Sequence, residues 1–376
     1  MAEGSALVGD AAETRHKLER LREAMQERKL DAMYLEGWAN VAWLCGGRGN
    51  RVVIDSPVGL CGVLVSADRA WLVAANNEGT RIKVEEFADL PLPIVTRAWY
   101  ALPLWLAAAP LMPHGARLGA DIAIPNAGDA SGLMAELRSP LEEPEIERYR
   151  ALGSDASQAL ELALVNIERG WTELEVAGGI AAALKARNVE ASVLLVGADE
   201  RTERFRHLVP TSNPVQHYLI ASVTAVRHGL HASLTRSLCF GPLPPALRER
   251  HLAVVTVDTA YLAASQPRAT LGEILRAGEE AYTEAGYYDE WQEHHQGGVT
   301  GYAGREVFAL PDSEVRLETN VAVAWNPTVP GAKSEDTFLI SEGGREQLTA
   351  APGSSWPSII ADGAPAGLTR SGVISL

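Results

Sequence analysis

The chain has 376 residues, of which 47% are hydrophobic and 22% are charged, a composition typical of a globular protein with two domains or one large one. Its formal net charge of −15 argues against binding to nucleic acid, because phosphates would be repelled. No apolar run reaches transmembrane length, and the first residues lack the layout of a signal peptide, so we expect a cytoplasmic protein that does not bind membranes.

Cysteine usage favours reduced thiols. The chain contains three cysteines, Cys45, Cys61 and Cys239, which lie in hydrophobic segments and show no CxxC spacing. Isolated cysteines in apolar surroundings are typical of buried thiols, since free cysteine is among the most buried residue types. We therefore expect all three to be free and buried.

The first 139 residues predict an α/β domain. Leu18, Leu21 and Met25 recur on one face of a predicted helix over residues 14–28, and charged side chains cover the rest of that helix. Strands are expected over residues 30–35, 59–65 and 70–74. Little chemistry is concentrated in this part of the chain.

A domain boundary is expected near Ser139-Pro140, because proline restricts the residue before it and suits the entry to a helix. Beyond it the pattern predicts helices over residues 144–169, 172–185, 246–264 and 271–285, and strands over residues 193–197, 218–226, 231–240, 321–325 and 337–341. Thr172 and Glu175 have the spacing of a capping box. Residues 352–376 are rich in Pro, Gly, Ser and Ala and are predicted to form an irregular tail.

Residues 293–306 concentrate the side chains that carry chemistry. This stretch holds the adjacent His294 and His295, four glycines, Tyr302 and the pair Arg305-Glu306. Histidine exchanges a proton near neutral pH, and glycine lets the backbone approach another group closely or adopt a positive φ. The stretch therefore predicts either part of an active site or a glycine-rich bend whose histidines are solvated.

Five segments in the later part of the chain carry a resemblance to a known superfamily. They are residues 145–150, 170–173, 206–211, 234–236 and 334–340. In this order they resemble the superfamily of creatinase, aminopeptidase P, prolidase and methionine aminopeptidase. The resemblance implies an α+β protein with an N-terminal creatinase-like α/β domain over residues 1–139 and a C-terminal pita-bread catalytic domain over residues 140–351, normally in a homodimer.

Most members of that superfamily hold two divalent metal ions with two Asp, one His and two Glu. Alignment to this sequence places neutral residues at four of those five positions, namely Ala221-Ser222, Ser233, Gly298 and Asn326. Only Glu335 matches a ligand, and one glutamate cannot hold two metal ions. We therefore expect no metal and no cofactor, although a single ion bound by His294, His295 and Glu335 stays open.

Creatinase, in the same superfamily, is a metal-free hydrolase of a C–N bond, in which a histidine transfers the proton. The matching histidine here is His207, which the resemblance implies as general acid and base. His294 and Glu335 are expected to assist, because His294 aligns with the start of the family's glycine pattern and is favoured over His295 as the one that faces the pocket. The residues expected to bind substrate are His295, Tyr302, Arg305, Asn326, Ser233 and Arg236.

The predicted function is a metal-independent, creatinase-like hydrolase of an amide, amidine or guanidino C–N bond in a small polar molecule. One alternative is non-hydrolytic chemistry in the same pocket, such as elimination or cyclisation, and another is a non-catalytic ligand-binding protein. For the individual residues, His207 could be a surface histidine, and Glu335 could form an ion pair with Arg305 or Arg236. The altered ligand positions disfavour a true Xaa-Pro metallopeptidase.

Overall fold

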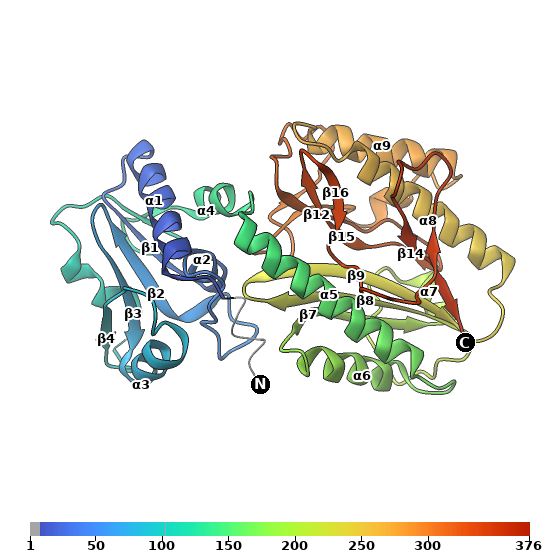
Figure 1. Cartoon of the computed structure of the whole chain (residues 1–376), viewed down its shortest axis with the longest axis horizontal. Coiled ribbons are helices and arrows are strands. Elements are labelled where there is room, and N and C mark those ends of the chain that lie inside the picture. The colour runs from blue at the N-terminus through green and yellow to red at the C-terminus, as the bar shows by residue number, and fades with distance from the viewer. Residues whose placement is uncertain (1–7, 102) are drawn as a thin grey trace. The chain divides into compact units, whose positions relative to one another are not determined.

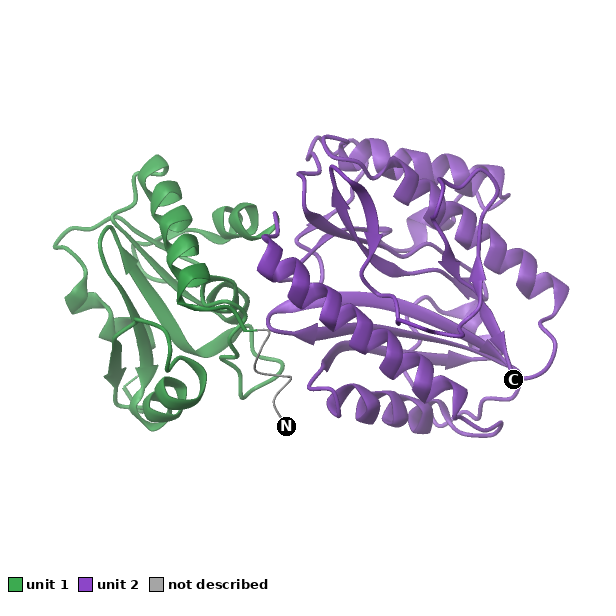
Figure 2. Ribbon diagram, in the orientation of Figure 1, with its two compact units in different colours: residues 1–139 green, residues 140–376 purple. Residues whose placement is uncertain are grey.

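The computed structural model describes residues 8–101 and 103–376. The chain divides into two compact units, Met1–Ser139 and Pro140–Leu376 (Figure 2). The division falls at the proline that the sequence marks as a boundary. Each unit is described below by itself.

Unit 1 is built on one six-stranded sheet with the strand order β4-β3-β2-β1-β5-β6 (Figure 1). Its strands are β1 (Ala32–Gly37), β2 (Val58–Ser66), β3 (Ala70–Ala75), β4 (Ile94–Arg97), β5 (Leu118–Ala120) and β6 (Gly128–Asp129). Its helices are α1 (Ala11–Glu27), α2 (Trp38–Leu44), α3 (Asn76–Arg81) and α4 (Ser131–Arg138), with a π-helical turn η1 (Ile82–Glu86) and 3₁₀ turns η2 (Leu104–Ala107) and η3 (Ala109–Leu111). The predicted α/β character and the buried face of α1, which includes Leu18, Leu21 and Met25, are confirmed.

Unit 2 contains the longer helices and two main sheets. The helices are α5 (Glu143–Val165), α6 (Glu173–Lys185), α7 (Glu200–Arg204), α8 (Pro245–Ala264), α9 (Leu271–Glu284) and the 3₁₀ turn η4 (Glu290–Glu293). The strands are β7 (Glu190–Ala198), β8 (Tyr218–Arg227), β9 (Leu230–Cys239), β10 (Gly297–Thr300), β11 (Val307–Phe308), β12 (Val321–Trp325), β13 (Thr328–Val329), β14 (Ala332–Lys333), β15 (Asp336–Ser341), β16 (Gly344–Gln347), β17 (Ser358–Ile359), β18 (Arg370–Ser371) and β19 (Val373–Ser375).

The two sheets of unit 2 have the orders β19-β9-β8-β7 and β11-β10-β12-β15-β16. Helices α5 and α6 pack on the first sheet, whereas α8 contacts β12 to β14 and carries α9 (Figure 1). Strand β9 meets β15 through side chain to backbone bonds, since Thr337 Oγ1 accepts from Ser233 N at 2.8 Å and donates to Ser233 O at 3.0 Å. This junction brings the residues around Glu335 against β8 and β9.

The start of α6 confirms the predicted capping box. Thr172 Oγ1 accepts a hydrogen bond from Glu175 N at 3.2 Å, and Glu175 Oε2 accepts from Thr172 N at 2.7 Å. Two helix-terminal N–H groups that lack a partner within the helix are satisfied in this way.

Most of residues 352–376 lie outside helices and strands, as the predicted irregular tail implies, but the segment also contains three short strands. These residues belong to unit 2 and form β17, β18 and β19, of which β19 runs parallel to β9. Arg370 is 1% exposed, and its Nε donates to Asp258 Oδ2 at 2.7 Å. Composition alone suggested an irregular segment, but strand pairing and a buried ion pair, which depend on distant residues, tie it to unit 2.

Two expectations about the whole chain can be compared with the described residues. Cys45, Cys61 and Cys239 are free and buried, as predicted. Within residues 8–101 and 103–376, no helix is both long and apolar enough to cross a membrane.

Candidate active site

A cavity of about 420 Å³ opens in unit 2 where β7 and β8 face the segments that follow β10 and β12. Five of the residues predicted to form the site line it, namely His207, His295, Arg305, Asn326 and Glu335. Further polar lining comes from Ser192, Ser222, Thr224, His231 and Lys333, and apolar lining from Val193, Leu195, Val223 and Phe308. The cavity therefore gathers segments that are far apart in the sequence.

The glycine-rich stretch forms one edge of this cavity. Gly297 and Gly298 lie in β10 with φ values of 120° and 144°. A Cβ atom on Gly297 would collide with the carbonyl oxygen of Ala324, and one on Gly298 with that of Val307. Both the positive φ and the close backbone approach that glycine permits are thus used here.

Glu335 closes a ring of four hydrogen-bonded side chains. Its Oε2 atom accepts from Lys333 Nζ at 2.8 Å and from Thr235 Oγ1 at 2.9 Å. Ser222 Oγ lies 2.7 Å from Thr235 Oγ1 and 3.3 Å from Lys333 Nζ. Because Thr235 gives its only hydroxyl proton to Glu335, Ser222 must donate to Thr235 and accept from Lys333. Every proton in the ring has an assigned acceptor except the third ammonium proton of Lys333.

Two cations keep the buried carboxylate of Glu335 ionised. Burial alone would raise its pKa, but Lys333 and then Arg305, whose Nη2 lies 3.5 Å from Oε1, outweigh burial and hold the pKa below its usual value. Burial also lowers the pKa of Arg305, and Glu335 only partly opposes this. The expectation of an ion pair with Arg305 is met, whereas Arg236 is bound elsewhere.

The prediction that His294 rather than His295 faces the pocket is wrong. The His295 side chain lines the cavity and packs edge-on against Phe308, with 5.0 Å between ring centroids. His294 is absent from the lining, and its Nδ1 lies 3.4 Å from the Nε2 atom of Gln296. Successive side chains do point in different directions, as expected, but the register places the second histidine inward.

Both histidines are held neutral at physiological pH. The ring of His295 is partly exposed; its desolvation within the cavity is the main cause that lowers its pKa to about 4, and the positive charge of Arg305 and Lys333 adds to this while Glu335 opposes it. For His294, burial likewise lowers the pKa to about 4. His207 shares the cavity with His295 and has an exposed side chain, and with His231 three imidazoles line the pocket.

Three residues predicted to bind substrate lie outside the lining. Tyr302 is 1% exposed and donates from its hydroxyl to Glu145 Oε1 at 2.7 Å. Arg236 is 2% exposed; its Nε atom lies 2.9 Å from Glu161 Oε1 and its Nη1 atom lies 3.0 Å from Asp336 Oδ1. Ser233 is fully buried behind the cavity wall, where its Oγ contacts Thr224 Oγ1 at 3.0 Å. The predictions for Tyr302 and Arg236 are therefore wrong, because their polar groups are used within the core.

Sequence reasoning missed Lys333 and the lining role of His231. Lys333 lies two residues before Glu335, and side chains two apart in an extended segment share a face. That spacing could have identified Lys333 as a neighbour of the carboxylate. His231 gave no comparable signal, since it lies beside the β8–β9 turn and could have pointed either way.

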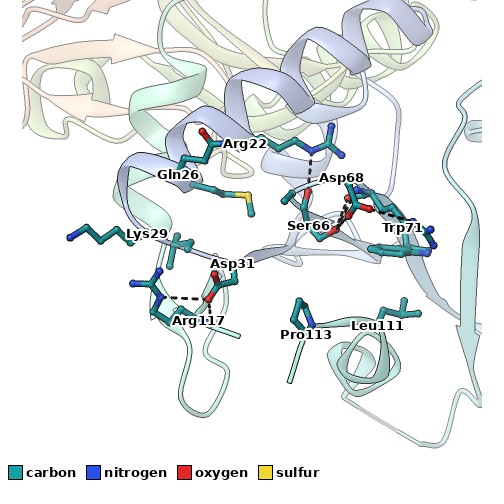
Figure 3. A pocket seen from close by; sticks show the side chains of 14 residues that line it. Arg22, Gln26, Lys29, Asp31, Ser66, Asp68, Trp71, Leu111, Pro113 and Arg117 are labelled. Carbon is teal, nitrogen blue, oxygen red and sulfur yellow. Dashed lines mark hydrogen bonds and ion pairs between the residues drawn. The ribbon is translucent and has the colours of Figure 1, made fainter. Parts of the chain in front are cut away.

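A larger cavity, of about 720 Å³, lies in unit 1 between α1 and the β2–β3 turn (Figure 3). Its charges are largely engaged locally, since Arg117 pairs with Asp31 at 3.5 Å and Arg22 donates to the carbonyl of Ser66 at 3.0 Å. No histidine lines this cavity within the described chain. The histidines that line the smaller cavity are in unit 2.

Two family models match the chain and together cover most of it. Residues 17–139 match the creatinase/prolidase N-terminal domain, and residues 147–342 match metallopeptidase family M24. The chain belongs to metallopeptidase family M24. The resemblance seen in the sequence and the α+β, pita-bread fold class are thereby confirmed.

Relatives and solved structures agree with this family. An uncharacterized peptidase of Staphylococcus saprophyticus is 23% identical over 234 residues, which span 59% of this chain and 66% of the relative, just under two thirds of its length. The structure of dipeptidase PepE from Mycobacterium ulcerans is 18% identical, with a TM-score of 0.77 over 98% of this chain and all of that one. The Xaa-Pro dipeptidase from Bacillus anthracis is 21% identical, with a TM-score of 0.73 over 91% of this chain and 99% of that one. At such identities the solved structures establish the fold.

Proposed function

We propose that the protein is a metal-independent hydrolase of a C–N bond in a small polar molecule, with His207 as general acid and base. The family and its named relatives are peptidases, which cleave C–N bonds, and this supports the reaction class. The observation that carries the proposal is one cavity that holds the imidazoles of His207, His231 and His295 beside a carboxylate already neutralised by cations.

The donor atoms of the cavity do not fit the pair of divalent ions that the family implies. Glu335 is the one acidic residue that lines it in the described chain, and its carboxylate is engaged by Lys333, Thr235 and Arg305. Divalent ions of this kind are bound by carboxylates and imidazoles, and hydroxyls such as that of Ser222 are weak substitutes. Residues 8–101 and 103–376 contain no cluster of three His, Cys, Asp or Glu side chains arranged to hold an ion.

A single ion held by His294, His295 and Glu335 is not supported either. His294 lies outside the cavity lining, and the carboxylate of Glu335 faces cations. We therefore assign the steps of the reaction to side chains of this chain and route none of them through a metal.

In the proposed reaction His207 takes a proton from a water molecule as its oxygen bonds to the substrate carbon. The same imidazole then gives the proton to the leaving nitrogen as the C–N bond breaks, so atoms and charge balance. Lys333 and Arg305 line the same cavity as His207, and in the proposed reaction their N–H groups stabilise the oxygen that becomes negative. His295, neutral and facing the cavity, assists in the role that the sequence assigned to His294.

The proposal is tested by product analysis in heavy-oxygen water with a panel of small carboxylate-bearing amides. Hydrolysis incorporates one solvent oxygen into the product acid, whereas elimination or cyclisation incorporates none. We expect His207→Ala to lower kcat by about 100-fold or more, given the usual contribution of general acid–base catalysis. His217→Ala, a change at an exposed histidine outside the cavity, serves as the matched control. Equal activity of both variants would overturn the role of His207.

A further inference from the structure

The charge of the cavity points to the kind of molecule it binds. Among the described residues that line it, two carry a permanent positive charge, Lys333 and Arg305, and one carries a negative charge, Glu335. That carboxylate is paired with both cations. A cationic substrate would find no uncompensated carboxylate, whereas an anion would meet a site with an excess of positive charge.

Donor groups on both cations remain available. Arg305 Nε is buried and has no hydrogen-bond partner within the described chain, and its side chain is 8% exposed. Lys333 Nζ has three protons, of which the bonds to Glu335 and Ser222 use two. A buried donor that lacks a partner is costly, so Arg305 Nε marks the place of an acceptor on a ligand, and the third proton of Lys333 is available to the same ligand.

A third buried polar group, the side chain of Asn326, needs a hydrogen-bond donor as its partner. Asn326 is 7% exposed, and its Oδ1 atom has no hydrogen-bond partner within residues 8–101 and 103–376. A carboxamide presents a carbonyl and an N–H₂ group, which match the N–H and C=O of an amide on a ligand. The lining is therefore complementary to a ligand with an anionic group near Arg305 and an amide near Asn326.

Part of the remaining wall is apolar. Val193, Leu195, Val223 and Phe308 face the cavity, and Val193 and Phe308 are 42% and 44% exposed. A cavity of about 420 Å³ leaves room for an apolar acyl group beside the polar part of a small molecule. Such a group would cover apolar surface that now faces solvent.

We propose that this cavity binds a small organic anion that carries an amide and an apolar acyl group, such as an N-acyl amino acid, and does not bind a guanidinium or amidine cation. The carboxylate lies against Arg305 and Lys333, the amide beside Asn326, and the acyl group against Phe308. This inference rests on the proposed function only for the location of the site, because it concerns binding and requires no turnover.

The experiment compares three probes of similar size by isothermal titration calorimetry on the full chain at pH 7. The probes are hippurate, an anion, hippuramide, which is neutral, and N-(2-aminoethyl)benzamide, a cation. We expect hippurate to bind at least about tenfold more tightly than hippuramide, because it adds one partly buried charge pair, and the cation to bind most weakly. A cation that binds as tightly as hippurate, equal binding of all three, or no binding of any would overturn the inference.

Substitutions at Arg305 and Asn326 test which side chain contacts which part of the ligand. Arg305→Gln is expected to reduce the affinity for hippurate by about tenfold and to leave that for hippuramide within about threefold, whereas Asn326→Leu weakens both probes equally. Arg276→Gln, at an arginine with 58% side-chain exposure outside the cavity, is the control. Should Arg305→Gln fail to fold, the double change Arg305→Gln and Glu335→Gln removes both charges of the pair and asks the same question. Loss of hippurate binding in the control alone would contradict the assignment.

Failure of this inference and failure of the proposed function give different results. If hippurate binds in the expected order but no amide in the panel is cleaved, the hydrolase proposal fails and the ligand class stands. If a cationic guanidino or amidine compound is hydrolysed instead, the ligand class fails and the reaction type stands.

Discussion

Arg370 offers a direct test of whether the last residues are an integral part of unit 2. Its guanidinium is 1% exposed, donates to Asp258 Oδ2 at 2.7 Å and lies 3.1 Å from Asp336 Oδ2. The change Arg370→Met keeps a long side chain but removes the charge, and with it the cation–π contact with the ring of Phe338. Asp336 retains its ion pair with Arg236, whereas Asp258 keeps only the hydroxyl of Ser334 at 2.5 Å among its hydrogen-bond partners in the described chain.

The cost follows from leaving a carboxylate buried without its cation. Removing one partner of a buried pair destabilises a protein by about 3–5 kcal/mol. For a unit of this size that corresponds to a fall of about 6–20 °C in the unfolding temperature. Burial already raises the pKa of Asp258, so part of the cost will be relieved by protonation at the lower end of the pH range.

The assay is thermal unfolding combined with hydrogen exchange of the C-terminal strands. Arg370→Met should lower the unfolding temperature and speed exchange in residues 370–376, and the added change Asp258→Asn should restore part of the loss because it removes the unpaired charge. Arg276→Met, at an exposed arginine, should stay within about 0.5 kcal/mol. An Arg370→Met protein with the stability and exchange of the wild type would refute the account of the tail.

Four further predictions concern the site, a cap and the assembly. The pKa of Glu335 in the folded protein lies below its ordinary value, so its ion pairs stabilise the protein at pH above the ordinary pKa, and this stabilisation is lost as pH falls through the lowered pKa. Glu335→Gln should remove this part of the acid dependence of the unfolding free energy, measured from pH 7 to 3. The imidazole of His295 should titrate with a midpoint near 4 by NMR, and a midpoint above 6 would contradict the desolvation and charge assigned to it. Because a histidine in the unfolded chain takes up its proton at about 6.5, the unfolding free energy should decrease as pH is lowered from about 6.5 to about 4. Thr172→Ala should cost about 1 kcal/mol in unfolding free energy, and no loss would mean that the cap is not formed. Light scattering is expected to give the mass of a homodimer, as the family resemblance implies, and a monomer mass would contradict that expectation.

Local patterns in the sequence were enough to predict much of the fold. The spacing of Leu18, Leu21 and Met25 identified the buried face of α1, and the pair Thr172 and Glu175 identified a helix start. These features depend on neighbours within a few residues, so the sequence carries them directly. The tail depended instead on Asp258 and on strand β9, more than 100 residues earlier, and composition gave no sign of either.

The candidate site shows the same distinction between local and distant information. Composition singled out the glycine-rich stretch as a candidate for part of an active site, but which histidine faces the cavity depends on the register of β10, in which Gly297 and Gly298 lie. A shift of one residue exchanges the two faces of an extended segment. Lys333 escaped notice because its role arises from contacts with Ser222 on β8, across the sheet junction.

The metal content of the purified protein distinguishes a metal-independent hydrolase from a metallopeptidase. The full chain, purified without chelator and without an affinity tag of histidines, is measured by elemental mass spectrometry, and the catalytic assay is repeated after chelation. The account predicts far less than one divalent ion per chain and unchanged activity, because the carboxylate of Glu335 is occupied by Lys333 and Arg305. Two ions per chain, with activity lost on chelation and restored by metal, would contradict the claim and indicate a metallopeptidase mechanism.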